Sequence, residues 1–347
     1  MKKIKVLIVD DSALIRKILT EIFSKTSDVE VVGVASDPLI ARDKIKQLNP
    51  DVLTLDIEMP RMDGLHFLSN LMRLRPMPVV MVSTLTAKGA PETLEALEMG
   101  AVDYICKPVA KTEEAFLSFS HHLCEKVRIA SCARVQFTDV KARSTPRIVT
   151  REKDENYRRI IAIGSSTGGT EAIAEVLAGL PVNRPPVVIT QHIPEVFSAS
   201  LAKRLNNRFP VEVVEARDNM KVENGRVIIA QGGKHLQFRR KGHELFTVID
   251  DGPKQNRHKP SVEIMFYSLL QVCGGKGIVA VMLTGMGADG AVAMKRLHDD
   301  GSLTIAQDEA SCVVWGMPKA AYEIGAVNTL VPLQKIASNI MKYAREA

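Results

Sequence analysis

Short hydrophobic segments alternate with amphipathic segments along the first third of the chain. The hydrophobic segments predict buried strands, and the amphipathic ones repeat apolar residues at the spacing of a helix. Alternating strands and helices of this kind predict a doubly wound parallel sheet. The predicted strands are Lys5–Val9, Val29–Ala35, Val52–Asp56, Val79–Ser83 and Asp103–Cys106, and the predicted helices are Ser12–Lys25, Pro38–Leu48, Leu65–Arg73, Thr93–Met99 and, roughly, Glu113–Ser131.

The periodicity is lost after Ser131, and the segment Lys141–Glu155 is rich in charged and small residues and contains Pro146. This composition is typical of a linker between folded units. A chain of 347 residues is also too long for one ordinary core, and its length predicts about two domains. The predicted units are a first domain over residues 1–131, a linker over 132–157 and a second domain over 158–347.

Hydrophobic strands resume beyond the linker, and helices between several of them again predict a mainly parallel sheet. Two further segments, His235–Arg239 and Leu245–Asp250, flank a Lys241-Gly242-His243 turn and predict a β-hairpin. We therefore expect an α/β chain with two doubly wound, mainly parallel-sheet domains. The remaining predicted strands are Ile160–Gly164, Val187–Gln191, Val211–Ala216, Val227–Ala230, Ile278–Leu283, Leu303–Ala306 and Val327–Val331.

The composition narrows the class of protein. Hydrophobic residues make up 46% of the chain and charged residues 25%, as in soluble globular proteins. The five cysteines are scattered without a Cys-x-x-Cys pair, which fits a reducing cytoplasm. The apolar segment Ile4–Val9 is too short for a signal peptide, and Ile278–Ala288 falls short of the roughly 18 residues of a membrane helix. We expect a cytoplasmic protein without direct membrane insertion.

The net charge of +6 raises the question of a nucleic-acid partner. Lysine and arginine are spread along the chain, however, and no helix-turn-helix or zinc-finger signature is present. An acidic protein partner or a solvated surface without any partner explains the same charge. We therefore expect no binding to nucleic acid.

Polar residues at the strand ends of the first domain indicate a phosphorylation site. Asp10, Asp11, Asp56, Ser83 and Lys107 all lie at the carboxyl ends of predicted strands, where an open parallel sheet binds its ligands. Three crowded carboxylates favour Mg²⁺, which could draw a phosphoryl donor onto Asp56. Lys107 could pair with the acyl phosphate, and Ser83 could donate a hydrogen bond to it. Taken alone, Asp10 and Asp11 are also explained as caps of the following helix.

Three motifs of the first domain resemble the response-regulator receiver family, and the likeness spans nearly all of residues 1–125. It implies a flavodoxin-like fold that is phosphorylated on an aspartate by a histidine kinase. The motifs are Val6–Ser12, Asp56–Gly64 and Lys107-Pro108.

By this resemblance Asp56 is the phospho-acceptor, and Asp10 and Asp11 hold Mg²⁺ together with Asp56. Ser83 stands where many members of the family have threonine, a change that keeps the hydroxyl group. The resemblance also implies a cis bond between Lys107 and Pro108. The implied switch residues are Ser83, Tyr104 and Lys107.

A glycine-rich turn opens the second domain. The segment Ile160–Gly169 runs from a predicted buried strand into a predicted helix, Thr170–Leu177, and contains Gly164-x-Ser166-x-Gly168. This arrangement places the Ser166 hydroxyl at the edge of the sheet, near backbone N–H groups and the positive end of a helix. The same turn suits a nucleotide phosphate, so the motif alone leaves both interpretations open.

A serine nucleophile needs an imidazole to take its proton, and His192 follows a predicted strand that ends at the same sheet edge. A strand-end histidine without a task is the alternative, and His258 is a rival base. Asp289 lies in a glycine-rich loop after another strand and could orient the imidazole, while the loop offers N–H groups for an oxyanion. Asp289 could instead cap the following helix, and Asp308 competes for its role, so the residues leave this choice open.

Five motifs, together with the order of the domains, resemble the chemotaxis protein-glutamate methylesterases. The likeness implies a Rossmann-like three-layer catalytic domain with a β-hairpin, placed after the receiver domain. The motifs are Ile163–Ala172, Gln191–Pro194, His258–Glu263, Leu283–Gly290 and Gln307–Cys312.

By this resemblance Ser166 is the nucleophile, His192 the base and Asp289 the orienting acid, and the Met286 N–H donates to the oxyanion. Ser165 occupies a position often held by alanine, and it adds a second hydroxyl group beside the nucleophile. Trp315 occupies a position often held by phenylalanine. The implied accessory pocket residues are Thr167 and His258.

The resemblance implies a phosphorylation-activated serine esterase that hydrolyses glutamate γ-methyl esters on methyl-accepting chemoreceptors and deamidates selected glutamines. Its implied phosphodonor is a chemotaxis histidine kinase. We expect a monomer that needs no cofactor for the hydrolysis itself. The competing classes are a nucleotide-binding adaptor, which would use the glycine-rich turn, and a transcriptional regulator, which the absence of a helix-turn-helix disfavours.

Overall fold

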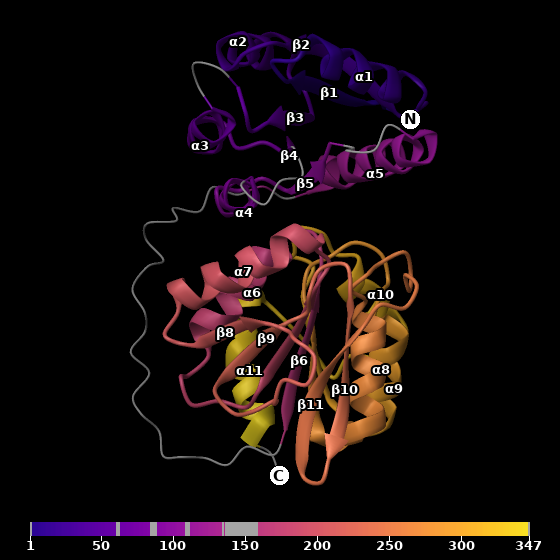
Figure 1. Ribbon diagram of the computed structural model, residues 1–347. Coiled ribbons are helices and arrows are strands. Elements are labelled where there is room, and N and C mark those ends of the chain that lie inside the picture. The colour runs from indigo at the N-terminus through magenta and orange to yellow at the C-terminus, as the bar shows by residue number, and fades with distance from the viewer. Residues whose placement is uncertain are drawn as a thin grey trace. The chain divides into compact units, whose positions relative to one another are not determined.

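The computed structural model describes residues 2–59, 63–83, 89–107, 112–133, 135 and 159–345. The chain divides into two compact units, residues 1–144 and 145–347. The predicted linker, 132–157, lies almost entirely outside the described residues, and the three-part division remains a prediction. Each unit has its own hydrophobic core and its own parallel sheet, as Figure 1 shows.

The first unit is a five-stranded parallel sheet in the order β2-β1-β3-β4-β5. Helices α1 and α5 pack against each other on one face, and α3 and α4 pack against each other on the opposite face (Figure 1). The strands are β1 (Ile4–Val9), β2 (Val29–Ala35), β3 (Val52–Asp56), β4 (Val79–Ser83) and β5 (Asp103–Cys106), and the helices are α1 (Ala13–Ser24), α2 (Pro38–Leu48), α3 (Gly64–Leu74), α4 (Ala90–Glu98) and α5 (Glu113–Cys132).

The second unit is a seven-stranded parallel sheet in the order β14-β13-β12-β6-β7-β9-β8, with a separate two-stranded hairpin. Its strands are β6 (Ile160–Ser165), β7 (Val187–Gln191), β8 (Glu212–Glu215), β9 (Arg226–Ile229), β12 (Ile278–Met282), β13 (Leu303–Gln307) and β14 (Thr329–Val331); the hairpin is β10 (His235–Lys241) and β11 (Glu244–Asp250), and the helices are α6 (Gly169–Gly179), α7 (Glu195–Arg208), α8 (Val262–Cys273), α9 (Ala291–Asp299), α10 (Met317–Glu323) and α11 (Leu333–Arg345), with a short 3₁₀ helix, η2 (Gly275–Gly277).

Two groups of helices cover this sheet. Helix α6 packs against α11, and α8 packs against α9, which in turn contacts α10. The hairpin lies along α8 and not in the main sheet (Figure 1). The predicted α/β class, with two parallel sheets and a hairpin, is confirmed.

Most predicted strands agree with the structure to within two residues, and two boundaries differ for identifiable reasons. The hairpin turn is shorter than predicted, because Lys241 pairs with Glu244 and leaves only Gly242 and His243 in the turn. Helix α4 begins at Ala90 and not at Thr93, because a proline such as Pro91 fits the first turn of a helix.

The described ranges contain no helix with the length and apolar character needed to cross a membrane.

Candidate functional site

The strand order of the second unit reverses at β6, which lies between β12 and β7. Loops that leave neighbouring strands in opposite directions open a crevice at such a point, where α/β sheets bind ligands. Backbone hydrogen bonds tie the three loops together at this edge. The Ser166 N–H donates to Thr284 O over 3.1 Å, and the His192 N–H donates to Ser165 O over 3.0 Å.

The turn from β6 into α6 depends on its glycines. Gly168 has a φ of +75°, and a Cβ atom there would lie 2.7 Å from Val313 Cβ. A Cβ atom on Gly169 would lie 2.1 Å from Gln191 Oε1. The turn is therefore tight enough to keep Ser166 at the end of the strand, against the β7 and β12 loops.

The two adjacent serines have different surroundings. Ser165 is fully buried, and its hydroxyl donates to Gln191 Oε1 over 2.6 Å. Ser166 is half-buried, and its hydroxyl has no hydrogen-bond partner among the residues that the structure describes. Gln191 completes the arrangement, because its Nε2 donates to Ser166 O over 2.9 Å. Ser165 thus stabilises the turn, while the Ser166 hydroxyl is available to react.

His192 and Asp289 form a buried pair, with His192 Nε2 2.8 Å from Asp289 Oδ2. Burial by itself raises the pKa of Asp289, but the hydrogen bond and charge of His192, followed by the other donors, outweigh it and lower that pKa. The ionised Asp289 accepts from Nε2–H, which leaves the Nδ1 lone pair as the basic position. His192 Nδ1 is buried and has no partner in the described part of the chain.

Three further donors reach the Asp289 carboxylate. Asn256 Nδ2 and Ser261 Oγ donate to Oδ1 over 2.9 and 2.8 Å. The Val262 N–H donates to Oδ2 over 2.7 Å. Asp289 does not cap its own helix, because the N-cap of α9 is Gly290. Its carboxylate is instead directed into the crevice at His192.

The other predicted base, His258, stacks on His192. The two ring centroids are 3.7 Å apart and the planes differ by 7°. His258 ends a two-residue turn in which Gln255 and His258 exchange backbone hydrogen bonds of 3.0 and 2.8 Å. The stack covers one face of His192 and limits its rotation, so His258 lies where an accessory residue of the pocket would lie.

The loop after β12 lies directly against Ser166. A Cβ atom on Gly285 would be 2.8 Å from Ser166 Cβ and 3.0 Å from Ser166 N. The half-buried Met286 follows this glycine, which brings its N–H group into the region of Ser166. Thr167 is buried, and its carbonyl accepts from Thr284 Oγ1 over 3.1 Å.

The rival acid, Asp308, belongs to a local turn. Its Oδ1 accepts from the N–H and the hydroxyl of Ser311, over 3.0 and 2.6 Å. The preceding Gln307 supports the β12 loop, because its Oε1 accepts from Thr284 N over 2.8 Å. The contacts of these residues therefore separate Asp308 from His192 and pair His192 with Asp289.

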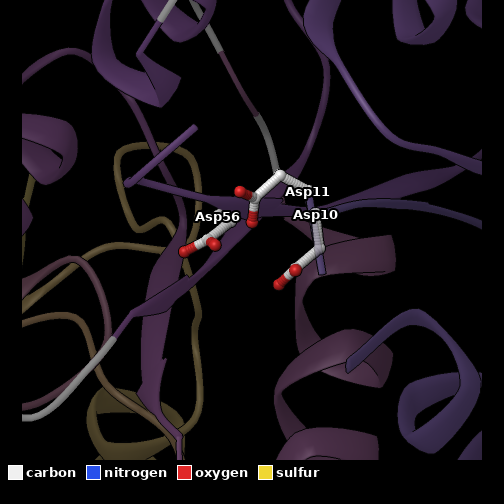
Figure 2. A group of neighbouring side chains, drawn as sticks. All are labelled: Asp10, Asp11 and Asp56. Carbon is white, nitrogen blue, oxygen red and sulfur yellow. The ribbon is translucent and has the colours of Figure 1, made fainter. Parts of the chain in front are cut away.

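The first unit brings Asp10, Asp11 and Asp56 together at the carboxyl edge of its sheet, with one carboxylate oxygen from each within 4.8 Å of the others (Figure 2). Burial raises the pKa of Asp56 to about 6, with a smaller contribution from the Asp10 charge, against the effect of Lys107. Ser12 is the N-cap of α1 and accepts from Ile15 N, while Asp10 Oδ1 accepts from the Ser12 N–H over 2.9 Å, so neither aspartate is itself the N-cap residue.

Lys107 Nζ offsets part of the negative charge of this cluster, at 2.8 Å from Asp56 Oδ2 and 3.0 Å from Asp10 Oδ2. Burial lowers the pKa of Lys107, but its hydrogen bonds and charge interactions with Asp56 and Asp10 raise it overall. Ser83 points elsewhere: its hydroxyl lies 3.3 Å from Thr93 Oγ1, which itself donates to Gly89 O. Ser83 must therefore give up its contact with Thr93 before it can donate to a group on Asp56.

Tyr104, the other predicted switch residue, is buried, and its burial raises the pKa of its hydroxyl group well above the ordinary value. Pro108 lies outside the described residues, so the predicted cis bond after Lys107 does too. The one cis peptide bond in the described ranges joins Lys259 to Pro260.

Three further residues of the candidate site, Asn256, Ser261 and Gln191, are not predicted from the sequence. The position of each residue in the sequence has a simpler local explanation: Asn256 lies in a turn, Ser261 at the start of a helix and Gln191 at the end of a strand. Gln191 and Ser261 fall within two of the motifs that resemble the methylesterases, which was the only available signal.

Two protein families match the chain. Residues 161–340 match the family described as CheB methylesterase, and residues 6–115 match the response regulator receiver domain. Both predicted family resemblances are confirmed.

Individual relatives match over nearly the full length. A protein-glutamate methylesterase/protein-glutamine glutaminase of Saccharophagus degradans is 51% identical over 347 residues, covering 99% of each chain. A protein of the same description from Salmonella typhimurium is 50% identical and covers 98% of this chain and 97% of its own. The crystal structure of the Thermotoga maritima CheB methylesterase catalytic domain is 36% identical with a TM-score of 0.52, covering 53% of this chain and 97% of that one.

Proposed function

Because the chain belongs to the CheB methylesterase family and carries a response-regulator receiver domain, we propose that it hydrolyses glutamate γ-methyl esters on methyl-accepting chemoreceptors and deamidates selected glutamines. The observation that carries the chemistry is the buried His192–Asp289 pair, whose unpaired Nδ1 lies at the same sheet edge as the Ser166 hydroxyl. A base and a serine hydroxyl at the same sheet edge are what nucleophilic acyl transfer needs. The relatives' names support the substrate class.

In the proposed reaction Ser166 Oγ attacks the ester carbonyl carbon while its proton passes to His192 Nδ1. Asp289 stabilises the imidazolium and keeps the second nitrogen protonated. The Met286 N–H donates to the oxyanion of the tetrahedral intermediate, which collapses as Nδ1–H protonates the departing methoxide to methanol. Attack by water on the acyl-serine, with the same proton relay, then releases the glutamate carboxylate and restores Ser166.

The same relay accounts for deamidation, because an amide and an ester pass through similar tetrahedral intermediates. For a glutamine, His192 would protonate the departing amide nitrogen in place of methoxide, so that it leaves as ammonia. His258 would hold the ring of His192 in place through both half-reactions, and Thr167 would line the pocket. None of these steps requires a metal or an organic cofactor.

Regulation is the second half of the proposal. Asp10, Asp11 and Asp56 fit a hard cation such as Mg²⁺, since their carboxylate oxygens converge and two of the three side chains are buried. When bound, the ion would offset the negative charge of an incoming phosphoryl group. A chemotaxis histidine kinase would phosphorylate Asp56, Lys107 would pair with the acyl phosphate, and rotation of Ser83 together with Tyr104 would transmit the change to the esterase.

The test is methanol release from a methylated receptor by the wild type, Ser166→Ala and Ser165→Ala. We expect Ser166→Ala to lower kcat by at least about 10³-fold, as loss of a covalent nucleophile does. Ser165→Ala, the matched control one residue away, should lose stability through the bond to Gln191 but retain turnover. Full activity in Ser166→Ala would contradict the proposal.

A further inference from the structure

Helix α8 begins at a serine that does not cap it. Ser261 is the N-cap residue, with extended backbone angles, yet its side chain accepts no hydrogen bond from the first turn of α8. Among the helices that the structure describes, four others are capped in the usual way, by a side-chain oxygen that accepts from the first turn. Their capping residues are Ser12, Asp37, Asp63 and Thr112.

The Ser261 hydroxyl is directed instead to a residue 28 positions away. It donates to Asp289 Oδ1 over 2.8 Å, while the first N–H of the helix, from Val262, donates to Asp289 Oδ2 over 2.7 Å. Asp289 thereby caps α8 from outside, where the positive end of the helix stabilises its charge. Ser261 is fully buried, so solvent does not compete for its hydroxyl.

The donors divide evenly between the two carboxylate oxygens. Oδ1 accepts from Ser261 and Asn256, whereas Oδ2 accepts from Val262 and His192. A carboxylate held on both oxygens cannot rotate without breaking several bonds to an ionised group, each of which is strong. The two contacts on Oδ1, together with the Val262 N–H on Oδ2, therefore keep Oδ2 facing His192.

The main chain of Ser261 is itself fixed by a buried histidine. The Ser261 N–H donates to His235 Nδ1 over 3.2 Å, and His235 Nε2 lies 2.9 Å from Pro253 O, to which it donates. His235 is fully buried at the start of β10. The hairpin thus fixes the main chain of Ser261 through His235, which keeps the Ser261 hydroxyl within hydrogen-bond distance of Asp289.

We propose that Ser261 is a positioning residue of the catalytic centre: its hydroxyl fixes Asp289 Oδ1 and so directs Oδ2 to His192 Nε2. The catalytic role of Ser261 rests on the proposed esterase function. Its hydrogen bonds to Asp289 and His235 are independent of that function. Ser261 acts only through Asp289 and His192. Its loss should therefore slow the chemical step and leave substrate binding unchanged.

The experiment compares Ser261→Ala with Ser268→Ala in the full chain. Ser268 is also buried on α8, seven residues further along, and its hydroxyl oxygen accepts from the Phe238 N–H over 2.8 Å. We expect Ser261→Ala to lower kcat about 10- to 100-fold, as loss of a hydrogen bond to a charged group implies, with KM unchanged. Ser268→Ala should lose a comparable amount of thermal stability and keep the wild-type kcat.

Proton NMR supplies a readout that does not depend on turnover. The low-field resonance of the His192 Nε2–H, bonded to Asp289, should shift in Ser261→Ala and stay in place in Ser268→Ala. An unchanged kcat in Ser261→Ala, with or without a loss of stability, would overturn the proposal, and so would a fall in kcat with an unchanged resonance. If the wild type releases no methanol, the esterase function fails, and the resonance alone decides the role of Ser261.

Discussion

At the scale of single residues, side chains that are adjacent in the sequence have different hydrogen bonds and charges in the candidate site. Ser165 and Ser166 are adjacent, yet the first hydroxyl is buried and donates to Gln191, whereas the second has no hydrogen-bond partner in the described ranges. Asp289 lies beside the buried Glu263, whose pKa is raised by burial and, to a smaller extent, by the Asp289 charge. Asp289 nevertheless stays ionised because the hydrogen bond and charge of His192, with the other donors, outweigh its burial.

The lowered pKa of Asp289 predicts a pH-dependent contribution to stability. The folded value of about 2 lies below the ordinary 3.8, so the ionised group stabilises the fold above about pH 4, and this stabilisation is lost as the pH falls through about 2. We expect Asp289→Asn to lower the free energy of unfolding by about 2 kcal/mol at pH 7. Denaturation followed by the fluorescence of Trp315, the single tryptophan, would measure it.

The same series at lower pH provides the control. The difference in unfolding free energy between the wild type and Asp289→Asn should narrow as the pH falls below about 4. A difference that stays constant from pH 7 to pH 3 would mean that the carboxylate is not held in its ionised form by these donors.

At the scale of elements, the turn Gln255–His258 holds two residues of the crevice at once. Its central residues, Asn256 and Arg257, have φ values of 50° and 69°, the left-handed pair of a type I′ turn. Asn256 reaches Asp289 from this turn, and His258 stacks on His192. Arg257 carries a Cβ atom at a position where glycine is preferred, so the turn is strained.

Replacing Arg257 by glycine should relieve this strain. We expect Arg257→Gly to raise the free energy of unfolding by about 1 kcal/mol, the cost of a side chain in left-handed backbone. Lys254→Gly is the matched control, an exposed cation of the same loop without a positive φ, and it should not stabilise. Equal effects of the two changes in chemical denaturation would rule out strain at Arg257.

The strands, most helix boundaries and both strand-end clusters could be predicted from the sequence, because hydrophobic periodicity and parallel-sheet topology are local or general rules. Contacts between distant segments could not. Asn256 and Ser261 lie 33 and 28 positions from Asp289, and each also has a local explanation as a turn residue or a helix cap. The contact of Ser83 with Thr93 depends similarly on how α4 packs beside β4.

At the scale of the whole molecule, the two chemical sites belong to separate compact units. Phosphorylation of one unit can change the activity of the other only if it shifts an equilibrium between states of the chain, and a tenfold change in activity corresponds to a shift of about 1.4 kcal/mol. Burial and Lys107 leave Asp56 in a cluster where added negative charge alters several contacts together.

Asp56→Asn tests this coupling, since the amide keeps the size of the side chain but cannot form the acyl phosphate. We expect the rise in methanol release caused by a small-molecule phosphodonor and Mg²⁺ to be lost in this variant. The wild type with and without phosphodonor is the reference. Equal stimulation of the wild type and Asp56→Asn would show that regulation does not pass through this aspartate.

The central place of β6 in its sheet bears on how the enzyme loses activity. Three strands flank β6 on each side, so its amide groups should be among the last to exchange with deuterated solvent in this unit. Opening of an edge strand, such as β8 or β14, leaves the attachment of Ser166, the proposed nucleophile, intact. Heat inactivation should therefore coincide with cooperative unfolding of the whole sheet, and partial fraying at its edges should be catalytically silent.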